Sequence, residues 1–192
     1  MMKKTILLIS VLALFIIAGC GGNQDKATKN GSDNANKKAT TENAKENKKN
    51  ETTNKDVYFK NNEAKLNDLK IKITGTKVIQ AGETGNKYGK KPVFAIWYDT
   101  TNLSDKDIDP TTAWGAVFEA IQDNNPNAVN KLEVGGLPDD KFLDSQLETI
   151  KKGGTVQNAV AYELDDLVTP VKLIATQGIG GDKLGEQTFN IK

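Results

Sequence analysis

The chain has 192 residues and a formal net charge of +1, and it contains a single cysteine and neither histidine nor arginine. Without histidine, this chain cannot form a Ser-His-Asp or Cys-His catalytic arrangement, a histidine zinc site or an imidazole acid–base catalyst. Without arginine, it cannot form a bidentate guanidinium clamp for phosphate or carboxylate.

The N-terminus has the pattern of a secretory signal peptide. Lys3 and Lys4 precede an apolar stretch that carries no charge from residue 5 to residue 19. The stretch is shorter than the roughly 20 residues that a membrane-spanning helix needs. We therefore expect residues 1–19 to be a signal peptide that is removed from the mature protein.

The segment Ile17-Ala18-Gly19-Cys20 resembles the lipobox of bacterial lipoproteins, with isoleucine where leucine is usual. The resemblance implies cleavage before Cys20 and a diacylglyceryl thioether on its sulfur, with fatty acyl chains such as palmitate. Two acyl chains hold a protein stably on a membrane, whereas one chain gives only marginal binding. The alternatives are a free thiol in a secreted protein and an uncleaved N-terminal anchor. We expect Cys20 to fix the protein to the outer face of the bacterial cytoplasmic membrane, with its domain extracellular.

Residues 20–56 are predicted to be a disordered tether that begins at the lipidated cysteine. From residue 21 to residue 56 the sequence contains no Val, Ile, Leu, Met or aromatic residue. Such a segment has nothing to bury that would offset the entropy lost on ordering. Its eight lysines face six acids, which argues against a polybasic contact with anionic lipid headgroups. A spacer is the simpler interpretation.

Residues 57–192 have the length of one ordinary domain with a core of its own. This part contains 16 lysines and 19 acids, for a net charge of −3. A mildly acidic domain is a poor candidate for nucleic-acid binding, which needs a basic face. Since the chain has no second cysteine, the core must be stable without a disulfide.

Short β-type patterns dominate this domain. Residues 69–73 and 171–173 alternate strictly between apolar and polar, and residues 93–100 form an apolar run rich in β-branched and aromatic residues. Four further strands are expected at 57–60, 113–121, 155–164 and 188–191. Clusters of Gly, Pro and Asn separate the segments. The pattern predicts an all-β fold, an Ig-like antiparallel sandwich of about seven strands.

One segment favours a helix, so we expect at most one short helix or helical turn. The residues 138–140 could begin it, and three apolar residues would share one face: Leu143, Leu147 and Ile150. The two tryptophans, Trp97 and Trp114, each lie in an apolar run. Large aromatic residues in such runs usually pack in the core, and we expect both between the sheets.

Three segments, 92–109, 121–124 and 150–175, resemble Ig-like domains of unknown function in Gram-positive lipoproteins. Asn124 stands where those domains have a glycine, and Lys152 where they have a proline. Asparagine keeps the turn feasible because it tolerates a left-handed backbone. These domains are related in fold to a mycobacterial immunoprotective extracellular antigen. The resemblance implies a surface-exposed sandwich, and it supplies no catalytic residues to transfer.

One group of acids could bind a metal ion. Asp105, Asp107 and Asp109 alternate, so in an extended loop their carboxylates could converge on Ca²⁺. However, Pro110 and Ala116 stand where an EF-hand loop has its glycine and its glutamate. The alternative is that these acids accept hydrogen bonds from local backbone in a turn. The sequence otherwise predicts neither a metal site nor a cofactor.

Two further groups are candidates for other functions. The acids Glu163, Asp165 and Asp166 could supply a carboxylate pair for glycoside hydrolysis, although nothing marks two of them as paired. The loop 85–91 is basic and contains Tyr88, so it could contact an anionic wall polymer. A solvated hairpin loop is the alternative interpretation.

These observations favour a surface lipoprotein that binds an unidentified protein or cell-wall polymer and is not an enzyme. The alternative is a small-solute or Ca²⁺-binding surface protein, followed by a carboxylate-dependent hydrolase. A two-lobed solute receptor would need two domains with a cleft between them, and about 136 residues hardly supply those.

Overall fold

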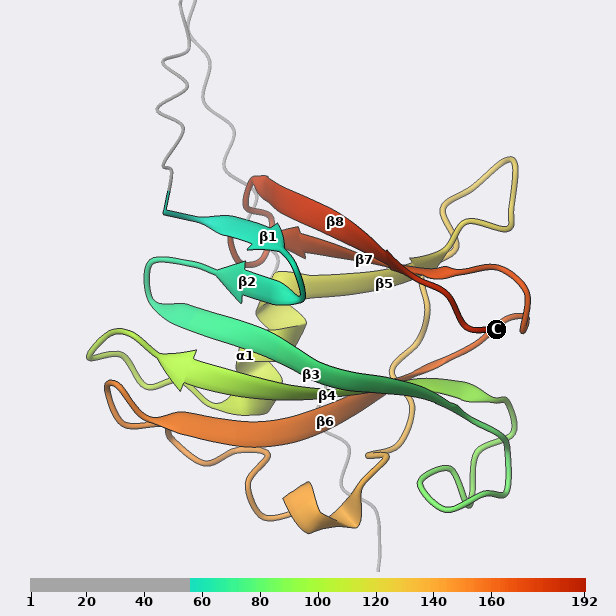
Figure 1. Cartoon of the computed structure of the whole chain (residues 1–192), viewed down its shortest axis with the longest axis horizontal. Helices are drawn as coiled ribbons and strands as arrows, with labels where there is room; N and C mark the ends of the chain where they lie inside the picture. The colour runs from blue at the N-terminus through green and yellow to red at the C-terminus, as the bar shows by residue number, and fades with distance from the viewer. Residues whose placement is uncertain (1–55) are drawn as a thin grey trace, which may run out of the picture. The chain divides into compact units, whose positions relative to one another are not determined.

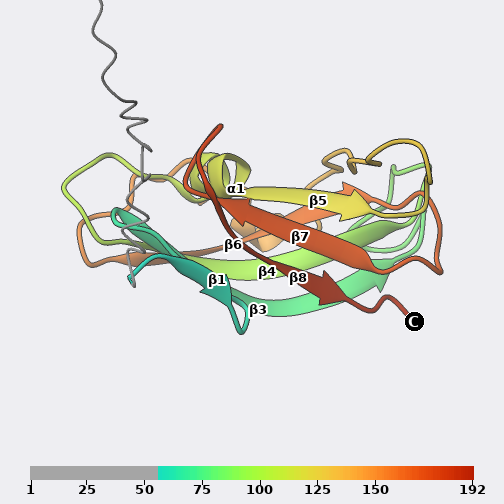
Figure 2. The same ribbon diagram turned by 90° about the horizontal axis from the view of Figure 1, so that it is seen from above.

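The structure, a computed structural model, describes residues 56–192, which form two antiparallel β-sheets (Figure 1, Figure 2). The five-stranded sheet has the order β1-β2-β3-β4-β6 and the three-stranded sheet the order β5-β7-β8. The strands of the larger sheet are β1 (Tyr58–Lys60), β2 (Glu63–Lys65), β3 (Leu69–Ile79), β4 (Val93–Asn102) and β6 (Thr155–Glu163). Those of the smaller sheet are β5 (Phe118–Gln122), β7 (Val171–Thr176) and β8 (Lys183–Phe189). The predicted all-β sandwich is confirmed.

Eight strands form where about seven were expected, because the first expected strand, β1, pairs in a hairpin with β2, which was not expected. Asn61 and Asn62 make the turn between β1 and β2 with positive φ angles of 51° and 63°. Two-residue hairpin loops of this type need a left-handed backbone, which asparagine tolerates better than most residues. The side chain of Asn62 also accepts a hydrogen bond from the Gln187 amide of β8, which links the two sheets at this side.

The core lies between the sheets and follows from the alternation of β4 and β7. Phe94, Ile96 and Tyr98 of β4 are buried on the face that meets the three-stranded sheet, whose β7 contributes buried residues of its own: Val171, Leu173 and Ala175. Trp114 confirms its predicted place in this core. Its ring centroid lies 4.4 Å from that of Tyr98, and its indole N–H donates to the Tyr162 hydroxyl at 2.7 Å.

A β-bulge in β3 reverses which face of the sheet its apolar residues occupy. The register with β4 shifts between Ile73 and Gly75, so the alternation changes phase at this point. Before the bulge, Ile71 and Ile73 point into the main core. After it, Ile79 joins a smaller apolar cluster on the outer face, together with Val93 of β4.

The expected strand at 113–121 was wrong over its first half. Residues Pro110–Val117 form the helix α1, and only the rest of the segment continues as β5. The Asp109 carboxylate accepts a hydrogen bond from the Thr112 N–H at 2.8 Å, and Pro110 occupies the first turn. An aspartate cap followed by proline is a strong helix start. Trp114 is buried here from a helix and not from a strand.

The expected helix after residue 138 is a single turn. A 3₁₀-helix, η1 (Asp140–Phe142), forms there, and the residues after it are irregular. Ile150 is buried, but Leu143 and Leu147 are 63% and 73% exposed, so the predicted shared apolar face does not exist. Within residues 56–192, no helix is long and apolar enough to span a membrane.

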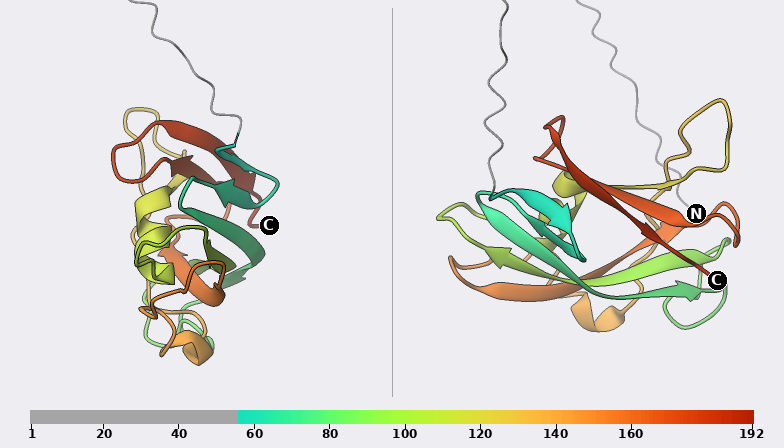
Figure 3. Two further views of the ribbon diagram at one scale, coloured as in Figure 1. Left: turned by 90° about the vertical axis from the view of Figure 1, so that its left-hand side faces the viewer. Right: turned by 45° about the horizontal axis from the view of Figure 1, so that its top comes forward.

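The long segment between β5 and β6 joins the edges of the two sheets. The Leu132 N–H donates to the Ala120 carbonyl of β5, and the Gly135 N–H donates to the Ala161 carbonyl of β6. The segment then leads to η1 beside β6, as Figure 1 and Figure 3 show. It thereby brings residues 139–142 onto the outer face of the five-stranded sheet. The predicted signal peptide, 1–19, and the predicted tether, 20–56, with Cys20, lie outside the described residues except for residue 56.

Candidate functional site

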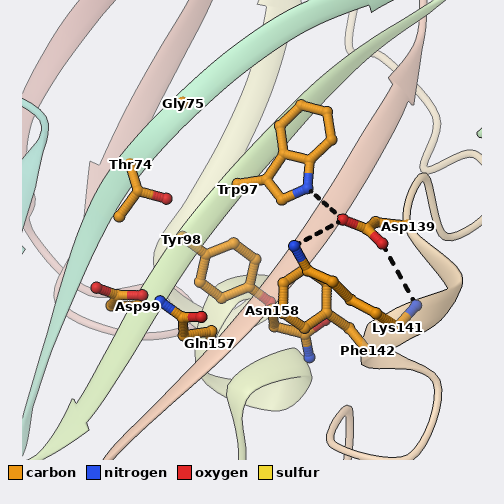
Figure 4. A pocket seen from close by; sticks show the side chains of 10 residues that line it. All are labelled: Thr74, Gly75, Trp97, Tyr98, Asp99, Asp139, Lys141, Phe142, Gln157 and Asn158. Carbon is orange, nitrogen blue, oxygen red and sulfur yellow. Dashed lines mark hydrogen bonds and ion pairs between the residues drawn. The ribbon is translucent and has the colours of Figure 1, made fainter.

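A polar pocket lies on the outer face of the five-stranded sheet, between β3, β4, β6 and η1 (Figure 4). Its volume is about 440 Å³. This size lies within the range of ordinary ligand sites. The side chains that give it its chemistry are Thr74, Trp97, Asp99, Asp139, Lys141 and Gln157. They come from four elements that are far apart in the sequence.

Trp97 stands at this pocket and not in the core, which corrects the expectation for this residue. Because Phe94, Ile96 and Tyr98 point inward, alternation along β4 turns the Trp97 side chain outward, and it is only partly buried. Its neighbours across the ladder are Gly75 of β3 and Ala159 of β6. A Cβ added at Gly75 would meet no atom within 4 Å, so there is open space on that side of the indole, whereas Ala159 on the other side is itself buried.

Asp139 fixes the orientation of the Trp97 ring. The indole N–H donates to Asp139 Oδ2 at 3.0 Å, and the Lys141 ammonium lies 3.1 Å from the same oxygen. The other oxygen of Asp139 accepts from the Lys141 backbone N–H and so caps η1. Phe142, which is buried, anchors η1 to the domain. The aromatic side chain is therefore held in place before any ligand arrives.

These contacts also shift the acidity of Asp139. Partial burial raises the pKa of its carboxyl group, but the hydrogen bonds from Trp97 and Lys141 and the Lys141 charge lower it by more. The net effect is a pKa below the ordinary value of 3.8. Asp139 is thus ionised at neutral pH, and it already has partners for its charge.

Asp99 is the carboxylate of the pocket that has an oxygen to which no described residue donates a hydrogen bond. Its Oδ1 is shielded from solvent and receives no hydrogen bond from any described residue. Its ladder neighbours are Lys72 and Gln157, but the Lys72 ammonium donates to the Asn61 carbonyl at 3.2 Å. A buried acceptor without a partner is costly and infrequent in native structures. It marks a place where a ligand could donate a hydrogen bond.

The structure does not bring the three alternating aspartates together. Asp109 caps α1, Asp105 forms an ion pair with Lys152 at 2.8 Å, and Asp107 is exposed. Within residues 56–192, no group of three or more acids, cysteines or histidines is arranged to hold a metal ion. The alternative interpretation, in which these acids accept hydrogen bonds from local backbone, describes Asp109, whereas the Asp105 ion pair joins residues 47 positions apart.

The acids after β6 also make structural contacts. The Asp166 carboxylate accepts hydrogen bonds from the backbone N–H groups of Thr169, at 2.6 Å, and Val168, at 2.7 Å. These bonds, the Thr169 bond first, together with one from the Asn124 amide, hold the pKa of Asp166 well below its ordinary value. Asp165 pairs with Lys91 at 3.4 Å.

The basic loop 85–91 is held in one conformation by a buried side chain. The Asn86 side chain is buried and donates to the carbonyls of Ile79 and Lys91, at 3.3 and 2.8 Å, so it closes the loop 80–92 from inside. Tyr88 at its tip is 89% exposed. The sequence did not indicate Asn86 as the residue that closes this loop.

Comparison with protein families gives one match. A family model described as a domain of unknown function (DUF5067) matches residues 42–177. The chain belongs to this family. The matched range contains β1 to β7 and every residue that lines the pocket beside Trp97.

A solved structure has the same fold as this DUF5067 chain. It is that of a protein from Staphylococcus aureus subsp. aureus NCTC 8325, named as a candidate lipoprotein, with a TM-score of 0.60 and 24% identity. The match covers 71% of this chain and 92% of the other. Comparison with curated proteins returned no match.

Gln122 is a second buried polar residue of this DUF5067 chain, after Asn86, whose structural role sequence reasoning missed. It is fully buried at the end of β5. Its Oε1 accepts from the backbone N–H of Asp165 at 2.7 Å, and its Nε2 donates to the Thr169 carbonyl at 2.8 Å. Gln122 thereby fixes the loop between β6 and β7 to the three-stranded sheet. The only signal in the sequence was a glutamine at the end of an apolar run.

Proposed function

We propose that this protein is a surface lipoprotein, anchored in the cell membrane through a diacylglyceryl group on Cys20, whose β-sandwich binds a ligand. The lipobox resemblance at Ile17-Ala18-Gly19-Cys20 supports the anchor. The likeness in fold to a Staphylococcus aureus protein named as a candidate lipoprotein is in keeping with it. In this proposal the domain lies outside the cell, and its partner is a protein or a wall polymer.

The observation that carries the binding role is the preformed pocket beside Trp97. An indole fixed by Asp139 and a shielded Asp99 oxygen that no residue of 56–192 bonds are features of a site built for recognition. A non-catalytic role is supported by the structural contacts of the other candidate acids. Asp166 accepts a hydrogen bond from the Thr169 backbone N–H, and Asp165 forms an ion pair with Lys91.

Metabolic labelling with radioactive palmitate tests the anchor. The wild-type protein should be labelled and found in the membrane fraction, whereas Cys20→Ala should be unlabelled. Ile17→Leu, which restores the usual lipobox residue, is the matched control and should be labelled like the wild type. An unlabelled wild-type protein, or a labelled Cys20→Ala variant, would contradict the proposal.

Photo-crosslinking on intact cells tests the binding role. A crosslinker placed at Gln157, on the rim of the pocket, should capture envelope material from wild-type cells. A crosslinker at Glu148, an exposed residue after η1 that does not line the pocket, should capture much less. Equal capture at the two positions would refute binding at this pocket.

A further inference from the structure

We infer that the pocket beside Trp97 binds a saccharide, with sugar hydroxyls donating to Asp99 and a sugar ring lying against the indole. This inference rests on the proposed binding function and names the ligand class for the same pocket. In Figure 4 the Trp97 ring faces the viewer, and Thr74, Asp99 and Gln157 lie along the strands on the side away from Asp139.

The charges of the pocket disfavour an anionic ligand. Its lining contains two carboxylates, Asp99 and Asp139, and one ammonium group, that of Lys141. The Lys141 charge is already paired with Asp139 at 3.1 Å. An incoming phosphate or carboxylate would therefore meet the negative charge of Asp99, whose Oδ1 has no partner among the described residues. A neutral ligand that carries hydrogen-bond donors meets an acceptor there instead.

The hydrogen-bonding groups of the pocket match a polyol. Asp99 Oδ1 is an acceptor without a partner among the described residues. The Thr74 hydroxyl and the Gln157 amide lie at the exposed rim. Each of these two groups can both donate and accept. A sugar hydroxyl also does both, so one ring can satisfy all three side chains, whereas an alkylammonium ion can only donate.

The shape of the pocket suits a flat ring. Gly75 and Ala159 flank Trp97 in the ladder, and a Cβ added at Gly75 would meet no atom within 4 Å. The indole is therefore accessible beside open space, and its orientation is set by Asp139. Indole rings combine a large apolar surface with a fixed geometry, so the C–H face of a sugar can pack on Trp97 without an induced change.

The test is isothermal titration of the full-length lipoprotein in detergent with chitotetraose, cellotetraose and maltotetraose. We expect at least one of them to bind, with a Kd in the micromolar to millimolar range. Asp99→Asn, which keeps the shape but removes the charge, should weaken binding at least tenfold. Gly75→Leu should abolish binding by filling the open space beside Trp97. Asp105→Asn, on a surface loop outside the pocket, should leave the Kd unchanged.

Two outcomes would overturn the inference. One is that none of the three saccharides binds, while thermal melting shows the protein to be folded. The other is that putrescine binds more tightly than every saccharide, which would assign the pocket to cations. If the crosslinker at Gln157 still captures envelope material in either case, the proposed function stands and only the saccharide assignment fails. If capture fails as well, both the saccharide assignment and the proposed binding role are wrong.

Discussion

Replacement of Gln122 by leucine tests whether this buried amide holds one end of the sandwich together. Gln122 is fully buried. Its Nε2 donates to the carbonyls of Asp166 and Thr169 at 3.0 and 2.8 Å. Its Oε1 accepts from the N–H groups of Asp165 and Asp166 at 2.7 and 3.3 Å. Gln122→Leu removes these four bonds and leaves their backbone partners without the amide.

The magnitude follows from these bonds and from the apolar gain. Each hydrogen bond contributes about 1 kcal/mol net, so the four together contribute about 4 kcal/mol. Burial of the leucine side chain returns about 1–2 kcal/mol. The free energy of unfolding should therefore fall by about 2–3 kcal/mol. For a domain of this size the melting temperature should drop by roughly 10 °C.

Urea denaturation followed by tryptophan fluorescence measures this change, because Trp114 is buried in the core. The matched control is Asn124→Ala, which removes two exposed hydrogen bonds, one from the Asn124 amide to Asp166 and one from the Asn130 amide to Asn124. A surface change of this kind should cost about 0.5 kcal/mol or less. If Gln122→Leu unfolds at the same urea concentration as Asn124→Ala, the amide does not stabilise this end of the domain.

Two further perturbations test other parts of the structure. Hydrogen bonds from Thr169, Asn124 and Val168 hold the pKa of Asp166 below the ordinary value of 3.8. The unfolded state therefore binds more protons in acid, and the free energy of unfolding should fall as the pH drops from about 4 to about 2. Asp166→Ala should flatten this dependence in melting curves, and an unchanged slope would contradict the assignment. Gly185→Ala should destabilise the domain by about 1–3 kcal/mol, because its Cβ would lie 2.6 Å from the Phe59 carbonyl oxygen. Gly136→Ala, with no atom within 4 Å, is its control in calorimetry, and equal melting temperatures would refute the packing argument.

The error at 113–121 shows which local signals the apolar pattern concealed. Asp109 and Pro110 are adjacent in the sequence and together predict a helix start. The apolar residues that follow were interpreted as a strand because β-type runs surround them on both sides. The helix was therefore predictable from the sequence, and the rules for helix capping would have found it.

The error at Trp97 has a different cause. β4 is covered on both faces, by the core on one side and by the segment after β5 on the other, so Val93 and Ala95 are as buried as Phe94. An apolar run without alternation does not show which of its residues face the core. The hydrogen bond from Trp97 to Asp139 spans 42 positions in the sequence, and no local pattern predicts such a bond.

By itself, the sequence determined that residues 57–192 form an antiparallel β-sandwich, because strand periodicity and turn residues act over a few positions. It also predicts lipid attachment at Cys20, from a motif of four adjacent residues. Only the tertiary structure decided which side chains meet at the pocket. The β-bulge at Gly75 and the pairing register of β3, β4 and β6 set those neighbours, and both depend on contacts between residues far apart in the chain.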